Sequence, residues 1–414
     1  MKQQRQQKDY LNMTHSILVN HFQTETKRSA HKTKLEQITD FLGKNGRAWI
    51  YYYLINRFGP NHPYQSYQGA HTGVYPLGPG PASIAIAADW ATDTQESTDV
   101  AIEMGKHLPD YTIHLGDTYF VGAPHEIDVN FTRKDSPWFR GSKGSFAILG
   151  NHEMYARGIA FFKTLLPTLG LNLGNGKFSG QHAGYFCLES SHWLILGLDT
   201  GYHSIGKIPI IEMIPGFGPD CHFDKKLITW LREVLKTQDP NHEKGLLILT
   251  HHQYMTAFKT QDEFLTPAGQ LAELVGTDRK LLWIWGHEHK FSVFESAKFG
   301  KGVFAYGRCI GHGGMPVELD DDSFKRDPGK HGDQKLVMVD KRLRTGQDGV
   351  RLGFNGYVKI TVEEEKLKVS YCDVNEKLLT EAWTVTSGSV AGKITYHSPK
   401  LQTVYGKTWQ DAIK

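Results

Sequence analysis

Residues 281–289, LLWIWGHEH, join a short and wholly apolar run to a cluster of polar side chains. Other segments share this design, an apolar run that stops abruptly at a polar residue: SIAIAAD (83–89), YTIHLGD (111–117), SFAILGNH (145–152), HWLILGLD (192–199) and GLLILTHH (245–252). Near-continuous apolar runs of this length are typical of strands that are buried on both faces. We therefore predict a sheet that is built mainly from these segments.

Helical patterns lie between these predicted strands. Residues 97–108 and 224–236 each place apolar side chains three or four positions apart, on one face of a helix. The alternation of strands and helices predicts an α/β layered domain. Segments within 335–385 instead alternate apolar and polar residues, which is typical of half-exposed antiparallel strands.

The start of the chain differs from the rest. Within residues 32–58 apolar side chains recur at helical spacing, and a stretch rich in Pro, Gly and Tyr follows. We expect residues 1–75 to form an N-terminal helical extension and linker, and residues 76–414 to form the main domain.

The composition excludes several classes of protein. Of 414 residues 39% are apolar and 22% are charged, which favours a globular chain over a disordered one. A net charge of +3 gives no overall attraction to nucleic acid or to a membrane. The four cysteines form no CxxC pair, and the first twenty residues contain no signal-peptide pattern. We therefore expect a reducing compartment, the cytoplasm.

Five of the predicted strands end in side chains that can bind a metal: Asp89, Asp117, Asn151, His251, and the pair His287 and His289. Ligands collect at the carboxyl ends of strands in open α/β sheets, because loops from many strands meet there. A mixed set of oxygen and imidazole ligands suits Mn, Fe or Zn better than Ca or Mg. No thiolate is in the set, so a structural zinc site is not expected.

In this order the motifs resemble those of the calcineurin-like metallophosphoesterases. The resemblance covers roughly residues 83–312 and rests on these motifs: Asp89, Gly116-Asp117, Gly150-Asn151-His152-Glu153, His251 and Gly286-His287-Glu288-His289. It implies a four-layer α/β/β/α sandwich, with the C-terminal antiparallel strands completing the second sheet and the N-terminal extension packed on the core.

The resemblance also implies roles for the individual residues. Asp117 would bridge two divalent or trivalent metal ions, with Asp89 and His289 completing one site. Three residues would complete the other site: Asn151, His251 and His287. Two such cations would turn the water between them into the hydroxide that attacks phosphorus.

Two residues of the third motif would act beside the metals. His152 resembles the family's acid, which protonates the leaving group. Glu153 would orient His152 by accepting its second ring N–H.

The sequence departs from the family pattern in the first motif. The family usually has His two residues after its first Asp, and here that position is Ala91. Purple acid phosphatases supply Tyr three residues after the second Asp, but position 120 is Phe, and Tyr119 has the wrong parity along a strand. The first site would then have three protein ligands plus water, or recruit another residue such as Asp93.

Two further residues are candidates for contact with the substrate. Arg308, in the segment GRCIGHGG, has a guanidinium that matches phosphate oxygens, although a structural role is equally compatible with its position. His251 lies at the tip of its strand and is the better ligand, which leaves His252 beside the metals or against the substrate.

We therefore expect hydrolysis of a phosphomonoester or phosphodiester, with a phosphate ester as the partner and neither membrane nor nucleic acid. A phosphoprotein phosphatase and a nuclease are alternatives within this class; the nuclease ranks last, because no Lys/Arg cluster is evident in the catalytic segment. A different alternative is a non-catalytic or weakly active metal-binding scaffold. Ala91 supports the scaffold, whereas His152 argues against it, because a structural site needs no acid.

Overall fold

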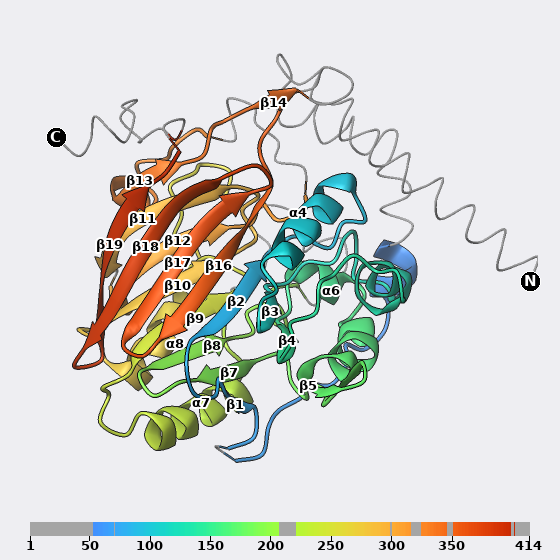
Figure 1. Cartoon of the computed structure of the whole chain (residues 1–414), viewed down its shortest axis with the longest axis horizontal. Helices are drawn as coiled ribbons and strands as arrows, with labels where there is room; N and C mark the ends of the chain where they lie inside the picture. The colour runs from blue at the N-terminus through green and yellow to red at the C-terminus, as the bar shows by residue number, and fades with distance from the viewer. Residues whose placement is uncertain are drawn as a thin grey trace, which may run out of the picture.

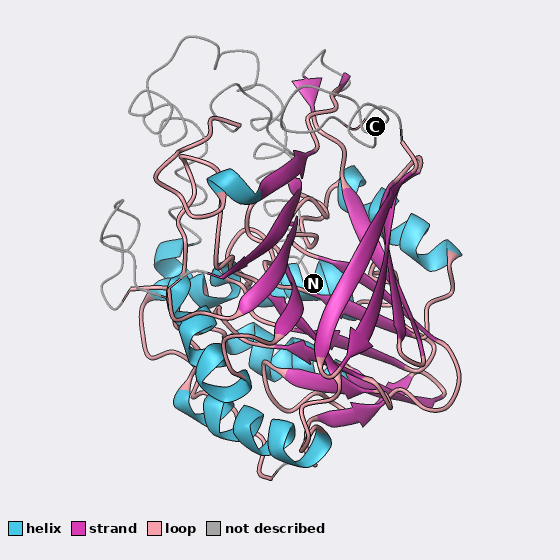
Figure 2. Cartoon of the chain, turned by 90° about the vertical axis from the view of Figure 1, so that its left-hand side faces the viewer, coloured by secondary structure: helices cyan, strands magenta, loops and turns pink. Residues whose placement is uncertain are grey.

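The computed structural model describes residues 53–69, 71–206, 221–298, 300–315, 324–345, 351–398 and 401. Within these ranges, two large sheets stack face to face and helices cover their outer faces (Figure 1). The same arrangement is visible after a quarter turn, where the strands of the two sheets cross and the helices lie outside them (Figure 2). The expected α/β sandwich is confirmed.

The first sheet carries the motif-bearing strands of the N-terminal half. In spatial order its described strands are β19 (Ser389–Tyr396), β18 (Lys377–Thr386), β17 (Lys366–Asp373), β16 (Gly356–Glu363), β2 (Ala82–Ala87), β3 (Tyr111–His114), β4 (Gly144–Ala147), β5 (Gly170–Gly174) and β6 (Lys177–Phe178). The strands β2, β3 and β4 are parallel, so their carboxyl ends lie at one edge of the sheet.

The second sheet carries the later motifs. Its described strands are β1 (Val74–Pro76), β7 (Phe186–Glu189), β8 (Trp193–Gly197), β9 (Gly245–Thr250), β10 (Lys280–Trp285), β12 (Phe304–Ile310), β11 (Phe291–Lys298) and β13 (Leu336–Val339). The strands β8, β9, β10 and β12 are parallel. A separate two-stranded pair joins β14 (Arg344–Thr345) to β15 (Arg351–Leu352).

The structure divides the predicted strands between the sheets differently from our expectation. We expected the C-terminal strands to complete the second sheet, but β16 pairs with β2 and brings β17, β18 and β19 into the first. Of the predicted C-terminal strands only β13 joins the second sheet, within the described residues. The motif strands themselves thus belong to two sheets.

Helices flank the sheets. The described α-helices are α4 (Gln95–Lys106), α5 (Pro124–Ile127), α6 (Asn151–Tyr155), α7 (Lys225–Gln238) and α8 (Leu265–Val275), and shorter helical turns are η2 (Asp128–Thr132), η3 (Phe161–Leu165), η4 (Leu166–Thr168) and η6 (Asp333–Lys335). The helix α7 begins where Asp224 accepts a hydrogen bond from the Lys226 N–H, and it buries the apolar stripe that the sequence predicted.

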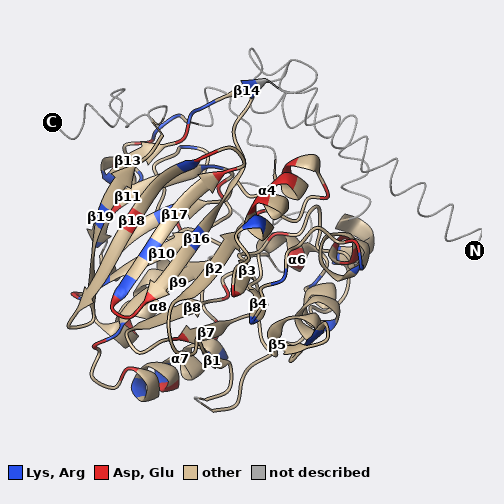
Figure 3. Cartoon of the chain, in the orientation of Figure 1, with Lys and Arg blue, Asp and Glu red and all other residues tan. Residues whose placement is uncertain are grey.

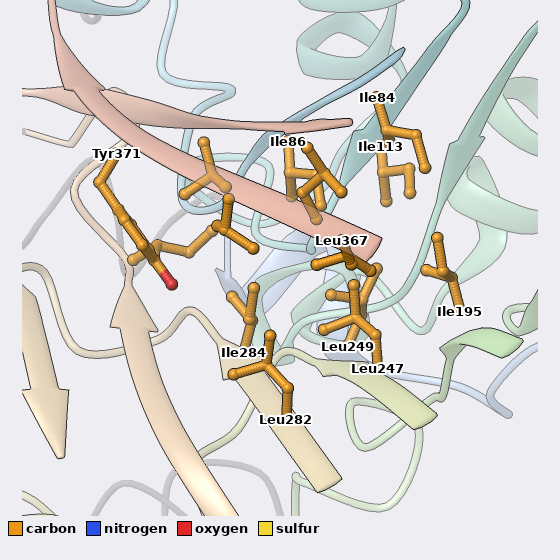
Figure 4. Packing of buried hydrophobic residues seen from close by; sticks show 14 of the residues in the cluster. Ile84, Ile86, Ile113, Ile195, Leu247, Leu249, Leu282, Ile284, Leu367 and Tyr371 are labelled. Atoms are coloured by element: carbon orange, nitrogen blue, oxygen red, sulfur yellow. The ribbon is translucent and has the colours of Figure 1, made fainter. Parts of the chain in front are cut away.

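Three apolar interfaces hold the four layers together, because both faces of the central strands are buried. In β9, Leu247 and Leu249 point between the sheets, whereas Leu246 and Ile248 pack under α7 and α8. The strand β2 alternates in the same way between the inter-sheet core and a third cluster under α4. Figure 4 shows side chains of β2, β3, β9, β10 and β17 meeting between the sheets.

The predicted N-terminal extension lies mostly outside the described residues. Residues 53–57 are helical, and Tyr53 is buried against the loop that follows β3. The strand β1 lies on the predicted boundary and pairs with β7. The division into 1–75 and 76–414 stays a prediction. Among the described helices, none has the length and apolar character needed to cross a bilayer.

Candidate metal centre

The centre forms where loops from both sheets meet at the carboxyl ends of their strands. Asp89 follows β2 and Asp117 follows β3, and the Asp89 N–H donates to the carbonyl oxygen of Gly116 (3.1 Å). His287 follows β10 in the other sheet, and its N–H donates to Asp89 Oδ2 (2.8 Å). These three non-glycine residues have φ values of 54°, 69° and 64°, in the left-handed region, and such backbone strain is concentrated at functional sites.

Glycines allow the loops to approach this closely. A Cβ on Gly150 would lie 2.0 Å from Asp117 Oδ1, and one on Gly286 would lie 2.6 Å from Asp89 Oδ2. A Cβ on Gly311 would lie 2.3 Å from the carbonyl oxygen of Glu288. The glycines of these motifs are therefore required by packing around the carboxylates.

The predicted ligands of both sheets come together. The ligand atoms of Asp89, Asp117 and His251 lie within 4.8 Å of one another, as do those of His251, His252 and His287. His251 belongs to both groups: its Nε2 is 3.3 Å from Asp117 Oδ2 and 3.2 Å from Asn151 Oδ1.

His289 lies at the more exposed side of the cluster. Its Nε2 is 3.5 Å from Asp89 Oδ1, and its side chain is 35% exposed. All six residues that the sequence proposed as ligands thus contact at least one other member of the set.

Tyr119 lies at the centre, although its position along the predicted strand suggested that its side chain would point away. Its hydroxyl oxygen lies 2.9 Å from Asp89 Oδ1, 3.1 Å from Asp117 Oδ2 and 2.8 Å from His289 Nε2. The alternation of side chains along a strand does not apply here, because Tyr119 lies in the loop beyond the end of β3. The N–H of Tyr119 donates to the carbonyl oxygen of Ala91.

Tyr119 therefore occupies the side of the site that Ala91 leaves without a ligand. Burial, followed by the charges of Asp89 and Asp117, raises the pKa of Tyr119 well above its ordinary value. The other substitute that we considered, Asp93, is exposed and belongs to neither ligand group found among the described residues.

His152 is oriented by a backbone carbonyl rather than by Glu153. Its Nδ1 lies 2.6 Å from the carbonyl oxygen of Phe120, so this nitrogen carries the proton and Nε2 is left for chemistry. The Nε2 faces the centre, 3.7 Å from Asp117 Oδ2.

The role expected of Glu153 is thus corrected. Its Oε2 accepts hydrogen bonds from the N–H groups of Asp117 (3.1 Å) and Gly150 (2.8 Å). Glu153 therefore fixes the two loops that carry Asp117 and Asn151, and burial together with the Asp117 charge raises its pKa to about 7.

The protonation states around the centre suit a cation. Burial would raise the pKa of Asp117, but His251 and His152 outweigh it and hold that pKa well below its usual range. Burial and the charge of His251 lower the pKa of His287 to about 3, so this imidazole is neutral. An ionised carboxylate beside a neutral imidazole is what a metal ion requires of its ligands.

His251 itself shows the need for a cation. Burial lowers its pKa, but the carboxylates of Asp117 and Asp89 outweigh burial and raise the pKa to about 9. The negative charges of the two carboxylates thus stabilise a positive charge at His251. The charge of this donor set therefore fits a bound cation.

Of the two residues predicted to contact the substrate, the structure places one beside the centre and the other away from it. His252, in the loop that follows β9, is buried, and its Nδ1 lies 3.1 Å from Thr200 Oγ1 in the loop that follows β8, so this contact joins the two loops beside the centre. Arg308 is not at the site: it lies in β12 between the sheets, and its Nε donates to Glu381 Oε1 (2.7 Å). The expectation of a phosphate contact is wrong for Arg308, because its guanidinium is buried and bound within the core.

Comparisons with known proteins identify the family. Residues 82–291 match the family model described as calcineurin-like phosphoesterase. No curated protein matches the chain in sequence. Solved structures similar to it include PhoD, with 11% identity, 78% of this chain and 73% of that chain covered, and a TM-score of 0.48.

Two other solved structures are also similar to the chain. GAP50, the anchor in the inner membrane complex of Plasmodium, has 12% identity, covers 72% of this chain and 86% of its own, and gives a TM-score of 0.44. Vacuolar protein sorting 29 of Cryptosporidium parvum has 9% identity, with 77% and 100% covered and a TM-score of 0.29. The assignment therefore rests on the family model, which matches just over half of the sequence: this chain belongs to the calcineurin-like phosphoesterase family.

Proposed function

We propose that the chain hydrolyses a phosphomonoester or phosphodiester with two metal ions bound at this centre. The observation that carries the proposal is the meeting of Asp89, Asp117 and His251 from both sheets, inside the region that matches the family. Two cations would supply Lewis acidity and a water acidic enough to attack phosphorus at neutral pH. Mn, Fe and Zn suit the mixed donors best.

The proposed ligand sets follow the contacts. Asp117, whose Oδ2 lies 3.3 Å from His251 Nε2, would bridge the two ions, and Asp89 and His289 would hold the first ion. Tyr119 joins the first ion's ligands, because its hydroxyl contacts both of those residues. The second ion takes the following ligands: Asn151, His251 and His287.

His152 is the proposed acid. Because the Phe120 carbonyl oxygen accepts the Nδ1 proton, Nε2 is the nitrogen that faces the centre, and in the doubly protonated imidazolium this atom is placed to give a proton to the leaving oxygen. Glu153 acts only through the loops that it ties together.

The scaffold alternative loses its main support once Tyr119 is considered. Ala91 suggested a weakened first site, but Tyr119 fills the side of the centre that Ala91 leaves open. Phosphoprotein phosphatase and nuclease remain alternatives within the class. A nuclease is not favoured, because Lys and Arg are scattered among Asp and Glu over the described chain in Figure 3. The four cysteines are buried and form no disulfide with one another, which supports our proposal of a cytoplasmic location.

The test is metal analysis combined with turnover. We expect bound Mn, Fe or Zn, and metal-dependent hydrolysis of an aryl phosphomonoester or a bis-aryl phosphodiester. Asp117→Asn should lose both activity and metal, whereas Lys226→Ala on α7 is an exposed control that should keep both. Full metal occupancy without turnover of either ester would instead support the scaffold.

A further inference from the structure

A pocket lies away from the metal centre, between η2, the segment that precedes β4, and the hairpin of β5 and β6. Its volume is about 730 Å³. Small-molecule sites commonly span roughly 300–1,000 Å³, so this pocket is large enough for a small ligand. Ser142 in its wall precedes the amino end of β4, whereas Asn151 follows the carboxyl end, so the pocket and the centre lie at opposite ends of this strand.

The lining is positively charged. Arg133, Lys134 and Arg140 line the pocket, and among the described residues that line it there is no Asp or Glu. The Nε of Arg133 lies 3.6 Å from a carboxylate oxygen of Asp135, whose side chain is 81% exposed. An ion pair this open to water is weak, so it leaves most of the positive charge uncompensated.

One nitrogen of the Arg133 guanidinium lacks a hydrogen-bond partner. Within the part of the chain that the structure describes, the Nε of Arg133 finds no acceptor although it is shielded from water. A buried donor without an acceptor is costly, and an anionic oxygen in the pocket would supply what it lacks.

The side chain of Arg140 is fixed in place by hydrogen bonds to other residues of the protein. Its guanidinium donates to the carbonyl oxygens of Thr168 and Phe131 and to the Thr168 hydroxyl, and it lies 5.2 Å from the centroid of the Phe178 ring. These bonds use three of its N–H groups, and a guanidinium has five. Burial lowers the pKa of Arg140 to about 10, so the guanidinium is still charged at neutral pH.

We propose that this pocket binds the phosphate groups of a small phosphorylated molecule, at a site separate from the metal centre. Two guanidinium groups and an ammonium match phosphate oxygens, and a prearranged Arg140 lowers the entropy cost of binding. The volume accommodates a ligand of nucleotide size.

The experiment measures pyrophosphate and ADP binding by calorimetry to the full chain after metal removal, so that the metal centre does not contribute. We expect one site per chain, and an affinity that falls as salt rises. The double variant Arg133→Ala/Lys134→Ala should weaken binding by about tenfold or more. The control Lys225→Ala/Lys226→Ala removes two exposed charges from α7 and should bind as the wild type does.

Two further variants separate the pocket from the centre. Asp117→Asn should keep pyrophosphate binding, and Arg133→Ala/Lys134→Ala, once reloaded with metal, should keep basal turnover. Binding that is absent in the wild type, unaffected by Arg133→Ala/Lys134→Ala, or lost in Asp117→Asn would overturn the proposal.

Discussion

At the scale of single residues, the hydroxyl of Tyr119 is the proposed substitute for a histidine ligand at position 91. It contacts Asp89 and His289 from a loop, where the alternation of a strand does not apply. Tyr119→Phe keeps the ring and removes only this oxygen. We expect this variant to bind metal about 10–100-fold more weakly at one of the two proposed sites, which is the typical effect of removing a group that hydrogen-bonds to metal ligands. Competition with a metal-binding dye measures this, and unchanged affinity at both sites would exclude Tyr119 as a ligand.

His152 should matter most when the leaving group is poor. We expect His152→Ala to lower kcat by roughly 10²–10⁴-fold on an alkyl phosphate, because the leaving alkoxide then lacks its acid. The loss should be much smaller on a nitrophenyl ester, whose leaving group needs no proton. Metal content is the control and should not change, since the Nδ1 of His152 is bound to Phe120 rather than to a ligand. An equal loss on both esters would contradict the role of an acid.

Asp199 gives the stability of the protein a pH dependence. Burial raises its pKa to about 7, so the fold favours the protonated acid, whereas the unfolded chain ionises near its ordinary value of about 4. The stability contributed by Asp199 is therefore fully present below about pH 4 and is lost as the pH rises through about 7.

The substitution Asp199→Asn tests this prediction, because an amide oxygen can still accept the N–H groups of Gly201 and Tyr202. Urea unfolding at pH 5 and at pH 8 should show a smaller loss of stability between these values in the variant than in the wild type. The same pH dependence in both proteins would show that Asp199 is ionised throughout.

At the scale of elements, the buried ion pair between β12 and β18 joins the two sheets. Glu381 accepts from Arg308 Nε, Tyr371 Oη (2.9 Å) and Trp383 Nε1 (3.0 Å), so both charges are bonded. Arg308→Met should cost about 3–5 kcal/mol in the free energy of unfolding, because it leaves the Glu381 carboxylate buried and unpaired.

A measurement of kcat distinguishes this structural role of Arg308 from a role in phosphate binding. The kcat of folded Arg308→Met should equal that of the wild type, and the double variant Arg308→Met/Glu381→Gln should recover part of the stability. The control Arg344→Met breaks a more exposed pair with Glu96 and should cost about 1 kcal/mol or less. A loss of kcat without a loss of stability would restore Arg308 as a substrate contact.

The sequence predicts the strands and the candidate ligands better than it predicts which strands pair and which groups contact the candidate site residues. The polar residue that ends each strand is a local signal, so Asp89, Asp117 and His251 are recognisable as candidate ligands from the amino-acid order alone. Which sheet a strand joins depends on contacts between distant segments, and β9 has the same pattern as β2 although they lie in different sheets. The carbonyl of Phe120 could not be foreseen, because every residue has one and its side chain does not mark it.

At the scale of the whole molecule, the proposed metal ligands come from both sheets, so bound metal should stabilise the complete fold. Removing metal with EDTA should lower Tm by an amount that returns on adding Mn²⁺ or Zn²⁺. At a free metal concentration of 100 times Kd, the linkage is worth about 2.7 kcal/mol. Scanning calorimetry with and without chelator measures the effect. In Asp117→Asn the chelator should have no effect, and an equal shift in that variant would show that the metal binds elsewhere.

The pairing of β2 with β16 has a consequence for how the protein is made. Ile84 is synthesised early, and its neighbour Ile360 emerges from the ribosome only after the described strands of the second sheet have been made. Until then one side of β2 has unsatisfied N–H and carbonyl groups, a template for association with other nascent chains. A chain cut short before β16 would retain every proposed ligand and still be expected to aggregate, so β16 protects a strand that leads into a proposed ligand, although β16 supplies none itself.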